Sequence, residues 1–187
     1  MTLITVTPPS GEPVPLGAVK EYLRIGHDGE DGLAADLLAS ARAQIETEAG
    51  IALVTRTLRF TLPNWPSMLH GRGSVLRPGP VTALAAVRSV DANAVTTDLT
   101  ANFMLEGGRL CLRPWSFAPP VPAGGHIEID FETGFGPASA VPEDLQLAVK
   151  MLAAHNYQRR DGSFGSAPDG LPSDVTQTLS KYREVRL

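Results

Sequence analysis

The spacing of apolar residues changes twice along this chain, from helical to alternating and back to helical. Near the N-terminus, apolar residues recur on one side of a helix, whereas in the middle third they alternate with polar residues as in a half-buried strand. After Pro142 the helical spacing returns. This order predicts an α+β fold: a helical bundle with a small, mostly antiparallel β-sheet inserted between its N-terminal and C-terminal helices.

The patterns divide the chain into segments within one domain, 1–187. A proline-rich, β-prone arm comes first, and we expect its anchoring to come from a neighbour. Helices precede and follow the β insertion along the chain. The chain ends in a stretch whose apolar spacing fits a short helix or a docking tail. In order, these segments are the N-terminal arm (1–13), helices (14–52), the β insertion (53–134), a long helix (142–160) and the C-terminal tail (171–187).

Individual elements follow from the same patterns. Residues 16–24 predict a short helix, and a second helix carries one apolar stripe and stops at Gly50. The stripe consists of Ala34, Leu37, Leu38, Ala41 and Ile45. Strands are expected at 55–62, 81–90, 94–98, 102–106, 109–112 and 126–133, with a hairpin turn at 106–108.

The clearest strand is the stretch HIEIDFETG, residues 126–134. Its apolar residues face one way, while His126, Glu128, Asp130 and Glu132 face the other. These four side chains could present metal ligands or an acid–base pair. The commoner arrangement, which we expect here, is the solvated side of a two-faced sheet.

Charge and cysteine content restrict the class of protein. The net charge of -4 and the pI near 5.5 argue against a general nucleic-acid binder, which needs a clustered basic surface. One cysteine, Cys111, excludes an intrachain disulfide framework and cysteine-based metal clusters. The first residues lack the pattern of a secretion signal, and no apolar run is long enough for a membrane anchor.

Catalytic motifs are absent from the sequence. The histidines 27, 70, 126 and 155 lack the spacing of zinc ligands, and no G-x-S-x-G, P-loop or GxGxxG pattern occurs. Cys111 lies in an apolar strand, where an inert thiol is expected. We therefore predict no enzyme, no catalytic or metal-binding residue and no cofactor.

The helix at 142–160 is apolar almost all round, apart from a narrow polar band. Such a helix belongs either at the centre of a small domain or against another subunit. Its end contains His155 and Asn156, which lie about 100° apart around the axis and therefore do not form a cluster. We interpret Met151, His155 and Asn156 as candidates for an inter-subunit contact.

Taken in order, seven stretches resemble the phage head–tail connector (adaptor) family of long-tailed phages and gene transfer agents. The resemblance spans most of the chain. The stretches are VPLGAVKEYLRI, HDGEDGLAADLLASARAQIETEAGIAL, TRTLRFTLPNWP, LRPGPVTALAAVRSVDAN, IEIDFETGFG, VPEDLQLAVKMLAAHNYQRRDG and KYREVRL.

The resemblance implies a structural protein of a virion or phage-like particle, assembled in the bacterial host cytoplasm. It implies a ring of about twelve adjacent copies between the portal protein and a stopper or tail protein. DNA would pass through the lumen without sequence-specific binding, and no membrane is involved. The tail would reach toward the portal, with Tyr182, Arg183, Arg186 and Leu187 as contacts.

Two alternatives stay open at this point. The chain fits another virion component, such as a stopper or tail-completion protein. Less favoured is a small metal-dependent hydrolase that uses the polar face from His126 to Glu132.

Overall fold

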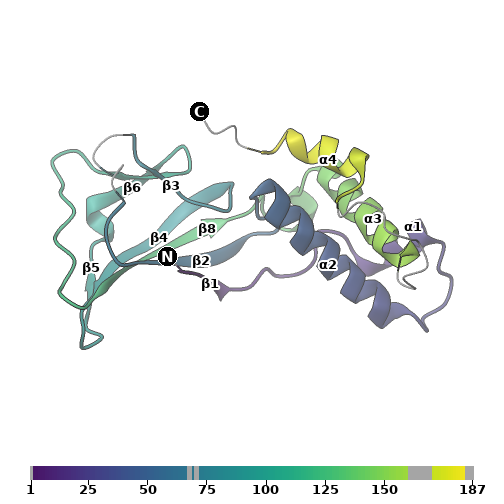
Figure 1. Cartoon of the computed structure of the whole chain (residues 1–187), viewed down its shortest axis with the longest axis horizontal. Coiled ribbons are helices and arrows are strands. Elements are labelled where there is room, and N and C mark those ends of the chain that lie inside the picture. Colours follow the sequence, from purple (N-terminus) through teal and green to yellow (C-terminus); the bar gives the residue numbers. More distant parts are fainter. Residues whose placement is uncertain (1, 67–68, 70–71, 160–169, 184–187) are drawn as a thin grey trace. The chain divides into compact units, whose positions relative to one another are not determined.

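The computed structural model describes residues 2–66, 69, 72–159 and 170–183. The chain forms two compact units (Figure 1). The sheet unit comprises Met1–Pro9 and Thr55–Gly134, and the helical unit comprises Ser10–Val54 and Phe135–Leu187. Helices together with two antiparallel sheets confirm the α+β class, and the sheet unit begins within two residues of the insertion expected at 53–134.

The sheet unit contains two antiparallel sheets that share one apolar core. The larger sheet has the order β1 (Thr2–Thr7), β2 (Arg56–Leu62), β8 (His126–Thr133), β4 (Val81–Val90), β5 (Thr96–Asp98). The smaller sheet has the order β3 (Ser74–Val75), β7 (Arg109–Leu112), β6 (Phe103–Glu106). A 3-10 turn, Thr100–Asn102, precedes β6.

Alternation explains how the larger sheet buries one face. Leu58 and Phe60 of β2 stand opposite Phe131 and Ile129 of β8, and all four side chains are buried. The Phe60 and Phe131 rings lie 5.2 Å apart, within the range of favourable aromatic pairs. The predicted hairpin turn is also present, because Gly107 and Gly108 take the positive φ values that join β6 to β7.

The N-terminal arm is held by its own chain. We expected a neighbour to anchor residues 1–13, but β1 pairs antiparallel with β2, with Thr2 opposite Thr61 and Thr5 opposite Leu58. The sequence TLITVT is rich in β-branched residues, which favour a strand. Pro8 and Pro9 follow the strand directly and cannot donate to a ladder.

The helical unit packs α1 (Leu16–Leu23), α2 (Asp31–Ala49), α3 (Glu143–Gln158) and α4 (Ser173–Ser180) around a second core. A 3-10 turn, Ala138–Ala140, precedes α3. Gly50 ends α2 in the left-handed conformation, as the sequence indicated. Buried residues of all four helices meet in this core, among them Val19, Leu38, Ala41, Ile45, Leu145, Val149, Leu152, Val175 and Leu179.

The C-terminal segment is partly core rather than a free tail. Val175 and Leu179 of α4 are 0% and 1% exposed and pack in the core of the helical unit. The short helix that the spacing in 171–187 allowed is present as α4. Arg186 and Leu187 lie outside the described residues. Within the described part of the chain, no helix is both long and apolar enough to cross a membrane.

Candidate functional site

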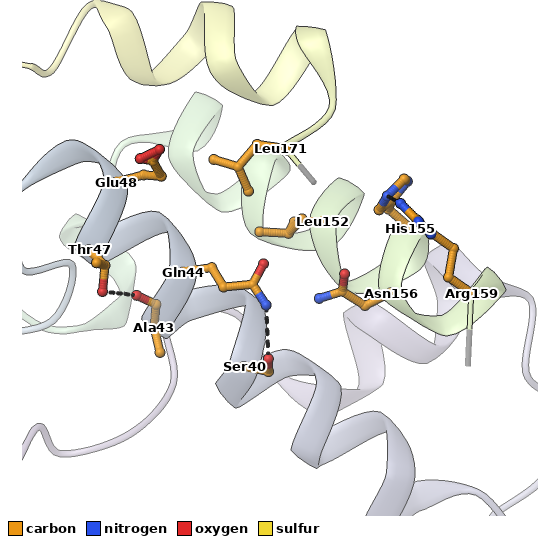
Figure 2. A pocket seen from close by; sticks show the side chains of 11 residues that line it. Ser40, Ala43, Gln44, Thr47, Glu48, Leu152, His155, Asn156, Arg159 and Leu171 are labelled. Atoms are coloured by element: carbon orange, nitrogen blue, oxygen red, sulfur yellow. Dashed lines mark hydrogen bonds between the residues drawn. The ribbon is translucent and has the colours of Figure 1, made fainter. Parts of the chain in front are cut away.

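An open groove of about 810 Å³ lies on the helical unit, between α2, α3 and the start of the C-terminal segment (Figure 2). Leu152, buried in the core, and Leu171 supply apolar surface, and the remaining lining is mostly polar. The lining residues are Ser40, Ala43, Gln44, Thr47, Glu48, Leu152, His155, Asn156, Arg159, Gly170 and Leu171.

Two of the three residues expected at a subunit contact line this groove. Asn156 points from α3 toward α2, whereas His155 lies beside Arg159, with 3.2 Å between its Nε2 and the Arg159 Nη1 (Figure 2). Met151 instead packs partly buried against the core of the helical unit. The structure therefore brings His155 and Asn156 to one surface without making them a cluster.

The groove's hydrogen bonds are those of a structural surface. Gln44 Nε2 donates to Ser40 Oγ at 3.1 Å, and Thr47 Oγ1 donates to the Ala43 carbonyl at 2.8 Å. Both bonds lie within α2. Among the described lining residues, no serine–histidine or histidine–carboxylate contact is recorded. The groove offers amide, hydroxyl and guanidinium groups together with the Glu48 carboxylate.

Tyr182 and Arg183, expected at the portal, hold the end of the C-terminal segment to the helical unit. The Tyr182 hydroxyl donates to Asp144 Oδ1 at 2.6 Å, and its ring packs edge-on against Phe135. Burial, together with this hydrogen bond to a carboxylate, raises the pKa of Tyr182 to about 12. Arg183 donates from Nε to the Glu48 carbonyl at 3.0 Å and from Nη2 to Glu48 Oε2 at 3.1 Å.

The polar face of β8 is an ion-pair cluster, which the sequence analysis missed. Arg59 of β2 donates to both carboxylate oxygens of Asp130, at 2.6 and 2.8 Å. Arg88 of β4 donates to Asp130 Oδ2 at 2.8 Å. Glu128 lies 3.1 Å from Arg59 and 3.8 Å from Arg88, and its other oxygen lies 3.7 Å from His126 Nε2. The expectation of a fully solvated face is wrong for Asp130, which is 5% exposed.

Electrostatics account for the burial of Asp130. Desolvation alone would raise its pKa, but the hydrogen bonds from Arg59 and Arg88 outweigh this effect and hold the pKa below its ordinary value. Because two guanidinium groups already occupy the carboxylate oxygens, a cation has little reason to bind there. The described residues contain no group of three or more histidines, cysteines and carboxylates arranged to hold a metal ion.

Three solved structures are similar to this chain over its whole length. A chain of the "Virion of native gene transfer agent (GTA) particle" is 33% identical with a TM-score of 0.83, and the match covers 100% of this chain and 97% of that chain. The "Neck of empty GTA particle computed with C6 symmetry" and the "Neck of native GTA particle computed with C12 symmetry" are each 32% identical over the same shares, with TM-scores of 0.82 and 0.80. No family model and no curated protein matches.

The matches define the class first: a structural protein of a virion or phage-like particle, as expected from the sequence. The particular family follows from the extent of the likeness. The chain belongs to the family of neck proteins found in gene transfer agent particles.

Proposed function

We propose that the chain is the head–tail adaptor of such a particle, in a ring of about twelve copies beneath the portal protein. The main support is the full-length likeness to a chain of a neck computed with C12 symmetry. The opposite side of the ring meets a stopper or tail protein. DNA passes through the lumen without sequence-specific contacts, in keeping with the net charge of -4.

The role requires no reaction. The carboxylates that a hydrolase would use, Glu128 and Asp130, are neutralised by Arg59 and Arg88, and the groove of the helical unit lacks a nucleophile paired with a base among its described residues. A ring adaptor needs surfaces for its two neighbours and for the proteins above and below it. His155 and Asn156, in the groove of the helical unit, are our candidates for an inter-subunit contact, with Met151 on the same helix.

For the portal contact, we propose the chain end that follows the anchor formed by Tyr182. Arg183 begins this segment, and Arg186 and Leu187 complete it outside the described residues. Tyr182 remains a candidate portal contact, and its hydrogen bond to Asp144 positions the segment that follows it.

Purified chain mixed with the cognate portal protein tests the adaptor role. Native mass spectrometry and negative-stain imaging should show a ring attached to the portal. A stopper or tail-completion protein would instead bind a preformed portal–adaptor complex or the tail, and not the portal alone. A chain that stays monomeric with the portal and does not attach to it would refute the proposal.

Removal of residues 184–187 tests the portal contact. Because Val175, Leu179 and Tyr182 all remain, the helical unit should keep its core and its melting temperature. We expect portal attachment to be lost in pull-down assays. Attachment at the wild-type level by the truncated chain would disprove the role of this segment.

A further inference from the structure

Strand β1 exposes an uncharged, apolar surface at the edge of the larger sheet. Leu3, Ile4 and Val6 are 43%, 48% and 46% exposed, and Thr2–Thr7 contains no charged residue. Soluble proteins usually protect an edge strand of this length with lysine or proline within the strand. Here the prolines come only after the strand ends, at Pro8 and Pro9.

The backbone of β1 is also open on its outer side. The strand is the first of the sheet, and among the described strands it pairs only with β2. One row of its N–H and C=O groups therefore has no partner strand, although a single irregularity interrupts the ladder between Thr5 and Thr7. A long, apolar edge without charge is a template for a strand from another chain.

The other end of the sheet is built differently. Its edge strand β5 has three residues, Thr96–Asp98, and the Asp98 carboxylate accepts hydrogen bonds from the Thr100 backbone and hydroxyl. The part of β4 beyond β5 carries two register shifts, between Val81 and Ala83 and between Leu84 and Ala86. Short strands, charges and bulges are the usual protections of an edge. Only the β1 side combines length, apolar side chains and an absence of charge.

We infer that β1 adds to a β-strand of the adjacent copy of this chain and so joins neighbouring subunits of the ring. The inference rests on the proposed function, since the C12 symmetry of the related neck supplies identical neighbours. An uncharged strand offers no complementarity to DNA phosphates. The contact is head-to-tail: two β1 strands paired with each other would create a two-fold axis and end assembly at a dimer.

Lysine substitutions on β1 test this contact. Leu3→Lys/Val6→Lys places two charges on the open edge while leaving Ile4, which stands opposite Arg59, unchanged. Leu3 and Val6 are both nearly half exposed, so lysine can keep its ammonium group in water and the isolated subunit should fold normally. At a concentration where the wild-type chain is mostly in rings with the cognate portal, we expect at least a tenfold smaller ring fraction by native mass spectrometry.

The matched control is Leu3→Ile/Val6→Ile, which changes the same positions but keeps them apolar and β-prone. This variant should form rings like the wild type, and all three proteins should melt at similar temperatures. Hydrogen exchange supplies a direct measurement, because amides of residues 2–7 should exchange at least tenfold more slowly in the ring than in the monomer.

The outcomes separate the two proposals. If the wild-type chain forms no ring with the portal, the adaptor function fails. If it forms rings and the lysine variant does so equally well, or if exchange at residues 2–7 is the same in ring and monomer, the adaptor function stands and the β1 contact is refuted. Disulfide-linked dimers of an Ile4→Cys/Cys111→Ser chain, formed through Cys at position 4 within the ring, would also overturn the head-to-tail arrangement.

Discussion

Replacing Asp130 with alanine should destabilise the sheet unit strongly. Asp130 is 5% exposed, and its carboxylate accepts hydrogen bonds from both Arg59 and Arg88. Loss of one partner of a fully buried ion pair costs about 3–5 kcal/mol. The side chains of Arg59 and Arg88 are 24% and 33% exposed, so water can accept some of the hydrogen bonds that they now donate to Asp130. We therefore expect a loss of about 2–3 kcal/mol in the free energy of unfolding.

Tryptophan fluorescence can follow this loss in the sheet unit alone. Both tryptophans of the chain, Trp65 and Trp115, belong to that unit, and Trp65 stacks on Phe103 with 5.0 Å between ring centroids. With an m-value of about 1.5 kcal/mol/M for a unit of this size, the urea midpoint should fall by about 1.3–2 M. The control is Glu132→Ala on the same strand and face, where the side chain is exposed and the change should stay within about 0.5 kcal/mol.

Acid titration gives a second measurement of the same interaction. The pKa of Asp130 is lower in the folded state than its ordinary value, so its contribution is complete above the unfolded pKa of about 3.9 and is lost as pH falls through the folded pKa. Asp130→Ala should therefore be closest to wild type at the lowest pH where both fold. If the free energy of unfolding of Asp130→Ala lies within about 0.5 kcal/mol of the wild-type value at pH 7, the role assigned to this ion-pair cluster is refuted.

Two further predictions concern the helical unit. Leu179→Ala, at a position that is 1% exposed, should lower its stability by about 2–4 kcal/mol in circular-dichroism melts, whereas the exposed Gln177→Ala should have almost no effect; equal effects would contradict the packing of α4. Tyr182→Phe should cost about 1 kcal/mol at pH 7 through loss of the 2.6 Å hydrogen bond to Asp144. Because that bond lowers the pKa of Asp144, the difference from wild type should shrink as pH falls through the folded pKa of Asp144; a difference that does not change with pH would disprove this coupling.

Short-range sequence patterns predicted the helices, strands and turns well because neighbouring residues determine these elements. The stripe from Ala34 to Ile45 and the stop at Gly50 specify α2, and the alternation from Ile127 to Phe131 specifies β8. The paired glycines at 107 and 108 likewise determine the turn between β6 and β7. In each case the residues that decide the structure lie within a few positions of one another.

Contacts between distant segments could not be predicted in the same way. Arg59 and Asp130 are 71 positions apart, and only the register of β2 against β8 brings them together. A period-two pattern assigns each to the polar face but does not say which strands are neighbours. For the same reason, the sequence TLITVT did not reveal its pairing with β2, and a neighbour was expected to anchor it.

The spacing of the C-terminal stretch left two possibilities open, a short helix or a docking tail. The structure contains the short helix: α4 has only eight residues, and its Val175 and Leu179, four residues apart, share one helix face. The groove of the helical unit was not predicted; the sequence indicated only that His155 and Asn156 lie about 100° apart around α3. The opposite wall of the groove, from Ser40 to Glu48, depends on how α2 packs against α3, which the sequence of neither helix predicts.

The first and last residues of the 55–134 insertion are neighbours, and so are the residues that flank it in the helical unit. In the sheet unit, Arg56 pairs with Thr133, and in the helical unit the Phe135 N–H donates to the Leu53 carbonyl at 3.1 Å. A segment whose entry and exit are adjacent can lengthen, shorten or be exchanged without moving the ends of the helices that flank it. Apart from β1, a change of chain length within the sheet unit can therefore leave the helical core undisturbed.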